Sequence, residues 1–259
     1  MQIVVLLKPV PDTTGSERLG PDMRLDRSSS PTIVNPNDEY AVEQALRLAE
    51  ASGAEITLLT MAPAGATETM RKALAMGAHR GVLVADDALA GSCALSTAKV
   101  LAAALATLEF DLVLAGADTS DGGGGVVAAS VAMLSGLPYL SCAGRVDLVD
   151  AGARIQRLEA GGYAVLEASL PALVVVTQMV GEPRYATLKG IMAARSREIR
   201  TIDLAAIGLA GAPVGGAAAT SRVLAARPAA ERGATRVVRG TPDEAARAIA
   251  DLLDDRRLL

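Results

Sequence analysis

The stretch "LVLAGADTSDGGGGVVAAS", Leu112 to Ser130, joins an apolar run to an alanine-rich helical pattern through a turn that contains four consecutive glycines. Because glycine has no side chain, this run suits a strand-to-helix turn that passes close to a ligand, most often a phosphate. A tight or mobile turn without a ligand stays the alternative, because a glycine-rich match alone is weak evidence. The stretch is not GxGxxG and lacks the Lys-Ser/Thr pair of a Walker loop, so it indicates neither of those modes of nucleotide binding.

On both sides of this stretch, short β-branched runs alternate with helical patterns. Strands are expected at residues 3–7, 55–61, 81–85 and 112–116, and helices over residues 35–51, 67–78, 92–108 and after the glycines. This alternation predicts an α/β fold with a mostly parallel sheet and helices on both faces, of the Rossmann-like or adenine-nucleotide-binding type. In such sheets ligands bind beyond the carboxyl ends of the strands, where the glycine turn lies.

The pattern changes after Leu137. Residues 145–177 read as short alternating strands, a small antiparallel excursion before the chain re-enters the sheet at ALVVVT. Beyond Gly211 the composition turns to Ala, Gly, Pro and Arg, and an amphipathic pattern, PDEAARAIADLLDD, closes the chain. We therefore expect an α/β nucleotide-binding domain over residues 1–211 and a C-terminal arm over residues 212–259 that packs on a partner subunit.

Composition excludes several classes of function. The chain has 259 residues, a net charge of -4, one Phe and no Trp, so it is poorly equipped to bind nucleic acid through phosphates or stacked bases. One His and two Cys, Cys93 and Cys142, argue against a metal site or a disulfide framework and suit a reducing cytoplasm. No run approaches a membrane span, and the first apolar run reads as a strand rather than a signal peptide. No arrangement of nucleophile, base or paired carboxylates indicates catalysis, so we expect no enzyme.

Four stretches in order carry a resemblance to a known family. They are NPNDEYAVEQA from Asn35, ETMRKALAMGAHR from Glu68, LPALVVV from Leu170 and EPRYATLKGIMAA from Glu182. Together they resemble the beta subunit of electron transfer flavoprotein, in register from Ile3 to about Ile207. The resemblance implies a heterodimer with an alpha subunit that holds most of the FAD. It also implies that the pair accepts electrons from dehydrogenases, such as acyl-CoA dehydrogenases, and passes them to a membrane quinone oxidoreductase. A stand-alone adenine-nucleotide-binding enzyme or sensor is the alternative function.

The same resemblance implies a site for one AMP, which has a structural role. The residues carried over lie at strand ends and helix starts: Leu6, Asn35, Pro36, Asn37, Asp38, Met61, Asp121, Gly122, Gly123, Gly124, Gly125, Val126, Val127, Ala128, Ala129, Ser130, Val131 and Ala132. Many family members carry acidic, amide and Thr side chains where this chain has glycine and valine, so backbone amides alone would contact the nucleotide at that turn. An ordinary helix cap is the alternative for Asn35 to Asp38, and core packing is the alternative for Met61.

The stretch EPRYATLKGIMAA adds a partner-recognition site by resemblance. Leu188 falls at the family's recognition leucine, and Ile191 and Met192 extend the apolar surface beside a basic rim. A buried staple for the short helix that follows is the alternative for Leu188. Arg184 either neutralises flavin or phosphate charge or forms a surface salt bridge.

Overall fold

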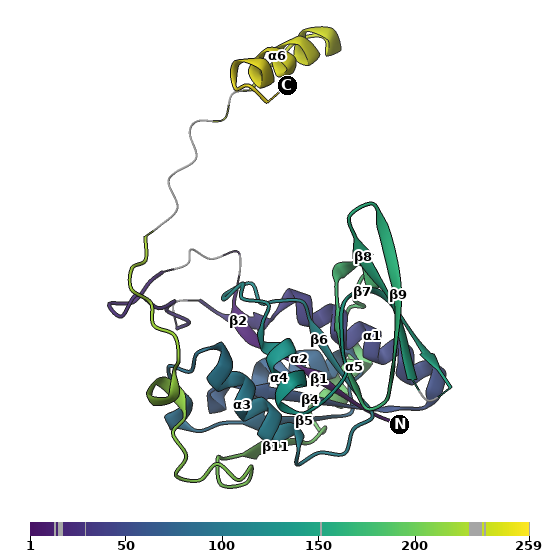
Figure 1. Ribbon diagram of the computed structural model, residues 1–259, viewed down its shortest axis with the longest axis vertical. Coiled ribbons are helices and arrows are strands. Elements are labelled where there is room, and N and C mark those ends of the chain that lie inside the picture. Colours follow the sequence, from purple (N-terminus) through teal and green to yellow (C-terminus); the bar gives the residue numbers. More distant parts are fainter. Residues whose placement is uncertain are drawn as a thin grey trace. The chain divides into compact units, whose positions relative to one another are not determined.

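The structure is a computed structural model that describes residues 1–12, 14, 18–28, 30–150, 152–227, 235 and 237–258. It divides into two compact units, Met1–Leu224 and Ala225–Leu259 (Figure 1). The first unit continues past residue 211, where the composition changes, because residues 215–218 pack on the main body. The Gly216 N–H donates to the Ala90 carbonyl at 2.8 Å, and the Ser96 hydroxyl donates to the Ala218 carbonyl at 2.9 Å.

A nine-stranded sheet forms the centre of the first unit, in the order β11-β5-β4-β1-β6-β10-β7-β8-β9. The strands that pair in parallel are β1 (Gln2–Leu6), β4 (Glu55–Met61), β5 (Arg80–Val84), β6 (Leu112–Gly116), β10 (Ala172–Val176) and β11 (Ile199–Ile202). β7 (Tyr139–Val149) runs parallel to β10 and antiparallel to β8 (Gly152–Glu159), which pairs with β9 (Gly162–Ser169). The predicted mostly parallel sheet with a small antiparallel excursion is confirmed. A separate ribbon pairs β2 (Pro9–Pro11) with β3 (Thr32–Val34).

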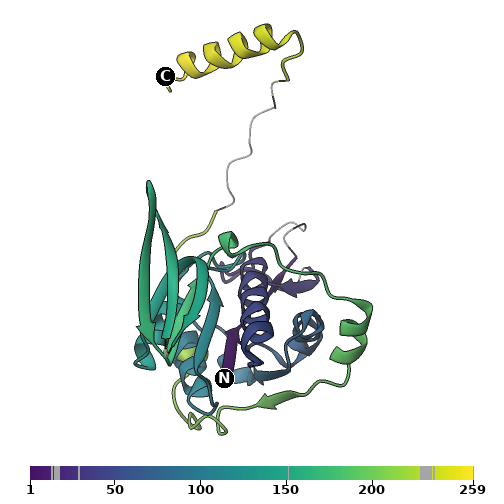
Figure 2. The same cartoon turned by 90° about the vertical axis from the view of Figure 1, so that its right-hand side faces the viewer.

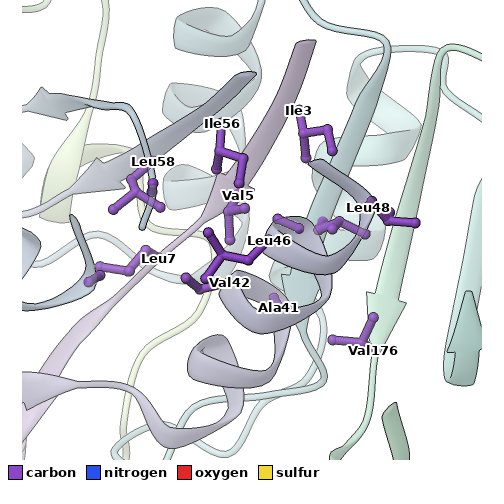
Figure 3. Close-up of a cluster of buried hydrophobic side chains, with 14 of the residues drawn as sticks. Ile3, Val5, Leu7, Ala41, Val42, Leu46, Leu48, Ile56, Leu58 and Val176 are labelled. Atoms are coloured by element: carbon purple, nitrogen blue, oxygen red, sulfur yellow. The ribbon is translucent and has the colours of Figure 1, made fainter. Parts of the chain in front are cut away.

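Helices cover both faces of the sheet, as the βα alternation predicts. α1 (Pro36–Ser52) and α2 (Thr67–Met76) pack on one face, and α3 (Ala94–Leu105) and α4 (Val127–Leu134) pack on the other. β1 serves both cores because its side chains alternate, with Ile3 and Val5 on the α1 side and Val4 on the α3 side. Figure 3 shows Val42 of α1 beside Val5 in the first of these cores. Burial on both faces explains why these strands are apolar throughout.

The remaining helices are short or stand apart. α5 (Leu188–Ala194) lies at the outside of the first unit, away from the β7–β9 extension (Figure 2). The described part of this unit also holds four 3-10 turns: η1 (Ala64–Ala66), η2 (Asp87–Leu89), η3 (Gln178–Val180) and η4 (Gly215–Ala218). α6 (Pro242–Asp255) belongs to the second unit and begins at a capping box, in which Thr241 and Glu244 bond to each other's backbone N–H. Among the described residues, every helix is too short or too polar to cross a membrane.

Candidate functional site

The carboxyl ends of three adjacent strands bring most of the predicted site residues to one edge of the sheet. β1 lies between β4 and β6, so Leu6, Met61 and the turn after β6 are neighbours in the fold. The side chain of Leu6 is buried in the core with α3 and α4, and half-buried Met61 packs against that same core. Leu6 can therefore face a ligand only through its backbone, whereas Met61 keeps part of its side chain accessible as well.

Asn35 links the start of α1 to the turn after β6. Its side-chain amide donates to the Asp118 carbonyl at 2.8 Å, and its carbonyl oxygen accepts from the Ser120 N–H at 3.2 Å. Asn37 also donates to Asp118, through both the backbone carbonyl at 3.3 Å and the carboxylate. The Asn35 side chain thus crosses to another loop and leaves α1 without the side-chain cap that the sequence suggested, within the described residues. Pro36 stands exposed at the first helical position.

Asp38 is buried and ties α1 to the end of β1. Its carboxylate accepts the Lys8 N–H at 2.7 Å. Burial raises the pKa of Asp38 to about 7, although hydrogen bonds from Lys8, Asn35 and Gly116 act in the opposite direction. A Cβ on Gly116 would lie 2.6 Å from Asp38 Oδ1 and from the Asn37 carbonyl oxygen. Glycine at the last position of β6 therefore lets the start of α1 approach the strand end closely.

Asp121, directly before the glycines, is held by two cations. Its side chain is 1% exposed and contacts Lys8 Nζ and Arg27 Nη2, each at 2.7 Å. Burial alone would raise the pKa of Asp121, but the contacts with Lys8 and Arg27 outweigh it and lower the pKa. Neither cation was expected from the sequence pattern. A lysine two residues beyond Leu6 was a usable signal for one, whereas Arg27 stands in a loop whose pattern gives none.

The four glycines form an open turn. Gly123 and Gly125 adopt positive φ angles of 54° and 60°, in the left-handed region that favours glycine. Gly122 and Gly124 lie outside that region. All four are exposed, and a Cβ on Gly124 would meet no described atom within 4 Å. The turn thus leaves free space beside Gly124 on the surface of this chain.

α4 begins directly after the turn, with Val126 at its N-cap. No side chain among the described residues caps its first amides. The predicted residues of this helix separate into two groups. Ala128, Val131 and Ala132 are buried in the core with α3, while Val126 is exposed and Val127, Ala129 and Ser130 are half-buried. Only the first turn of α4 can therefore face a ligand, through its backbone amides.

The glycine turn, the start of α4 and Lys8 together suit an anion. Uncapped amides at a helix start carry partial positive charge, and the Lys8 ammonium lies 3.7 Å from the position that a Cβ on Gly122 would take. An ammonium has three N–H donors, so Lys8 can keep Asp121 and still bind a phosphate oxygen. The residues present fit a nucleotide phosphate at this turn. Among the described residues, no group of His, Cys, Asp and Glu could hold a metal ion.

An exposed apolar cluster marks a second feature, at α5. The exposed fractions are 95% for Tyr185, 75% for Leu188, 45% for Ile191 and 64% for Met192. Thr187 caps the helix by accepting the Gly190 N–H at 3.0 Å. Leu188 is therefore a surface residue of this chain and not a buried staple. Arg184, at the start of this loop, forms ion pairs with Glu43 and Glu50 of α1, which is the salt-bridge alternative raised for it.

Fold and site together define a doubly wound α/β protein with an open, cation-lined glycine turn at its strand ends and an exposed apolar loop. The electron transfer flavoprotein domain family matches residues 22–207. The electron transfer flavoprotein subunit beta of Mycobacterium tuberculosis is 41% identical over 233 residues, covering 87% of this chain and 88% of the relative. That of Thermoanaerobacterium thermosaccharolyticum is 31% identical over the whole of both chains. The acryloyl-CoA reductase electron transfer subunit gamma of Anaerotignum propionicum is 33% identical, covering 80% of this chain and 79% of the relative. The chain belongs to the electron transfer flavoprotein family, among its beta subunits.

Proposed function

We propose that this chain is the beta half of a heterodimeric electron carrier that accepts electrons from acyl-CoA dehydrogenases and passes them to a membrane quinone oxidoreductase. The observation that carries the proposal is the 75% exposure of Leu188. Leu188 lies on the loop that resembles the family's recognition segment. An exposed apolar anchor beside basic side chains suits brief docking to a redox partner. The name of the A. propionicum relative supports an acyl-CoA enzyme as the partner class.

The cofactors divide between the two subunits in this proposal. FAD is held mainly by the alpha subunit, because this chain has few aromatic side chains to stack on a flavin. AMP binds at the strand ends, with its phosphate at Gly122 to Gly125, the first amides of α4 and the Lys8 ammonium. The nucleotide supplies structural support and takes no part in redox chemistry. The chain itself carries no catalytic residues.

In this proposal, the second unit is the part of the chain that binds the alpha subunit. α6 is amphipathic, and Ile249 on it is 57% exposed. A helix with an uncovered apolar face needs a partner to bury it. We place the heterodimer in the cytoplasm, where free cysteines such as Cys93 and Cys142 are stable.

Co-expression tests this function most directly. The chain alone should purify colourless, whereas co-expression with the alpha subunit encoded by the same organism should yield a yellow heterodimer with one FAD. Addition of an acyl-CoA dehydrogenase and its acyl-CoA substrate should then bleach the flavin absorbance. Stoichiometric FAD on the isolated chain would contradict the division of cofactors and favour a stand-alone nucleotide-binding protein.

A further inference from the structure

We propose that the exposed loop around α5 is a preorganised docking platform, held by one clamp on α1 and one on α2, and that Arg71 is its positioning residue. The inference rests on the docking role proposed for Leu188. It assigns a role to residues that lie outside the docking surface and outside the nucleotide site.

The clamp on α2 connects the carboxyl ends of two helices. Arg71 Nη1 donates to three carbonyls at the end of α5, those of Ala194 at 2.7 Å, Arg195 at 3.3 Å and Arg197 at 3.4 Å. In return, Arg197 Nη1 donates to the Leu74 carbonyl in the last turn of α2 at 3.2 Å. Carbonyls at a helix end lack partners within the helix and carry partial negative charge. Arg71 therefore satisfies the end of α5, and Arg197 adds a second donor to the Leu74 carbonyl, which also accepts the Gly77 N–H at 3.0 Å. Together the two arginines fix the helices to each other.

Gly190 brings α5 into backbone contact with α2. A Cβ at Gly190 would lie 2.3 Å from the Ala75 carbonyl oxygen, which is well inside van der Waals contact. Ala194, one helical turn further along α5, is 2% exposed. The side of α5 that carries these two residues is thus seated on α2. Leu188 and Met192 are left exposed to the solvent.

The clamp on α1 fixes the start of the loop. Arg184 binds Glu43 through its backbone N–H at 3.1 Å and through Nε at 2.8 Å, and it also pairs with Glu50. Arg47 donates to the Val180 carbonyl at 2.7 Å. Burial opposes ionisation of Glu43, but the hydrogen bonds from Arg184 and Arg47 outweigh it and lower the pKa of Glu43. Residues 180–184 are therefore anchored by charged contacts to one helix.

Between the two clamps the chain presents two strongly exposed apolar side chains, Tyr185 and Leu188. A free loop of this kind would have to be ordered when a partner binds, and that ordering reduces affinity. If a loop is competent to dock for only a fraction of the time, its apparent dissociation constant rises by the inverse of that fraction. The two clamps keep that fraction high.

The test uses the heterodimer with its alpha subunit and an acyl-CoA dehydrogenase from the same organism, supplied with saturating acyl-CoA. Arg71→Ala should raise the half-saturation concentration of the carrier about 3- to 10-fold, with the maximal rate and FAD content unchanged. Amide hydrogen exchange should accelerate over residues 188–195. Arg71→Lys should restore part of the loss, since an ammonium can still donate to these carbonyls. Lys72→Ala is the control, because Lys72 contacts the Thr32 carbonyl instead.

Different outcomes separate this inference from the docking function. If Leu188→Ala raises the half-saturation concentration and Arg71→Ala leaves it unchanged, docking is right and the positioning role is wrong. If neither change affects it, the docking function fails, and the inference fails with it. The double variant should lose less docking free energy than the sum of the two single losses, and fully additive losses would place the effect of Arg71 elsewhere. Should Arg71→Ala yield no folded heterodimer, Arg197→Ala takes its place with the same expected outcome.

Discussion

The Lys8 ammonium contacts the Asp121 carboxylate at 2.7 Å, so a residue two positions beyond the end of β1 is tied to the residue that precedes the glycine turn. Arg27 approaches the same carboxylate from a third segment of the chain. Asp121 is thus the shared partner of both cations. Its carboxylate is buried, while Lys8 and Arg27 are partly exposed. Four predictions follow the contacts at the strand ends and at α5.

Asp121→Asn should lower the free energy of unfolding by about 1 to 2 kcal/mol at pH 7, because two charged hydrogen bonds to a buried group are lost while partly exposed cations are rehydrated. The pKa of Asp121 lies below its ordinary value of 3.8 in the folded chain, so its contribution is fully present above that value and is lost as the pH falls below it. Urea unfolding at several pH values should show that the difference in free energy of unfolding between parent and variant disappears below about pH 4. If this difference persists at low pH, the destabilisation by Asp121→Asn comes from packing and not from the charge of Asp121.

Gly116→Ala should destabilise the chain by about 1 to 3 kcal/mol, because the new methyl group overlaps the start of α1. The close distances are the 2.6 Å to Asp38 Oδ1 and to the Asn37 carbonyl oxygen. Gly65→Ala is a matched control, since a Cβ there meets no described atom within 4 Å. Thermal unfolding of the two variants should separate them by several degrees. Equal melting temperatures would show that α1 shifts without cost.

Gly124→Val should reduce co-purified nucleotide and lower the melting temperature together, since a ligand that binds only the folded state stabilises it. A side chain at Gly124 has free space within the chain itself, so the loss should come from the ligand. Chromatography of denatured protein measures the nucleotide. After removal of nucleotide, parent and variant should melt at the same temperature. Unchanged nucleotide content in the variant would show that the glycines form a mobile turn that does not contact the nucleotide.

Leu188→Ala should raise the half-saturation concentration of the carrier for an acyl-CoA dehydrogenase about 5- to 30-fold, which corresponds to about 1 to 2 kcal/mol of docking free energy. FAD content and photoreduction of the flavin should match the parent, because Leu188 is exposed and is not among the residues assigned to a cofactor. Leu19→Ala, an exposed leucine on another loop, serves as the control. Unchanged kinetics with a melting temperature lower by several degrees would give Leu188 a structural role instead.

The sequence alone determined the fold class and the position of the turn that lies at the candidate site. Runs such as Glu55–Met61 and Leu112–Gly116 coincide with the observed strands, since parallel strands covered on both faces must be apolar along their whole length. The helix pattern at PDEAARAIADLLDD is also exact in its bounds as α6, because its capping box and apolar period are local features. Local rules of this kind need no knowledge of what lies next to each element.

The contacts between side chains that are distant in the sequence follow from the three-dimensional fold. β11 is a short edge strand whose residues are defined by pairing with β5, so its own pattern of Ile, Arg and Thr gave no clear strand signal. The Asn35 side chain reaches a turn more than 80 positions along the chain in place of capping its own helix, and Arg27 reaches Asp121 across a similar separation. Arg71 meets α5 because α2 and α5 are neighbours in space. Such contacts depend on which strand ends and helix ends the fold places side by side. A sequence pattern does not show how far apart in space those ends lie.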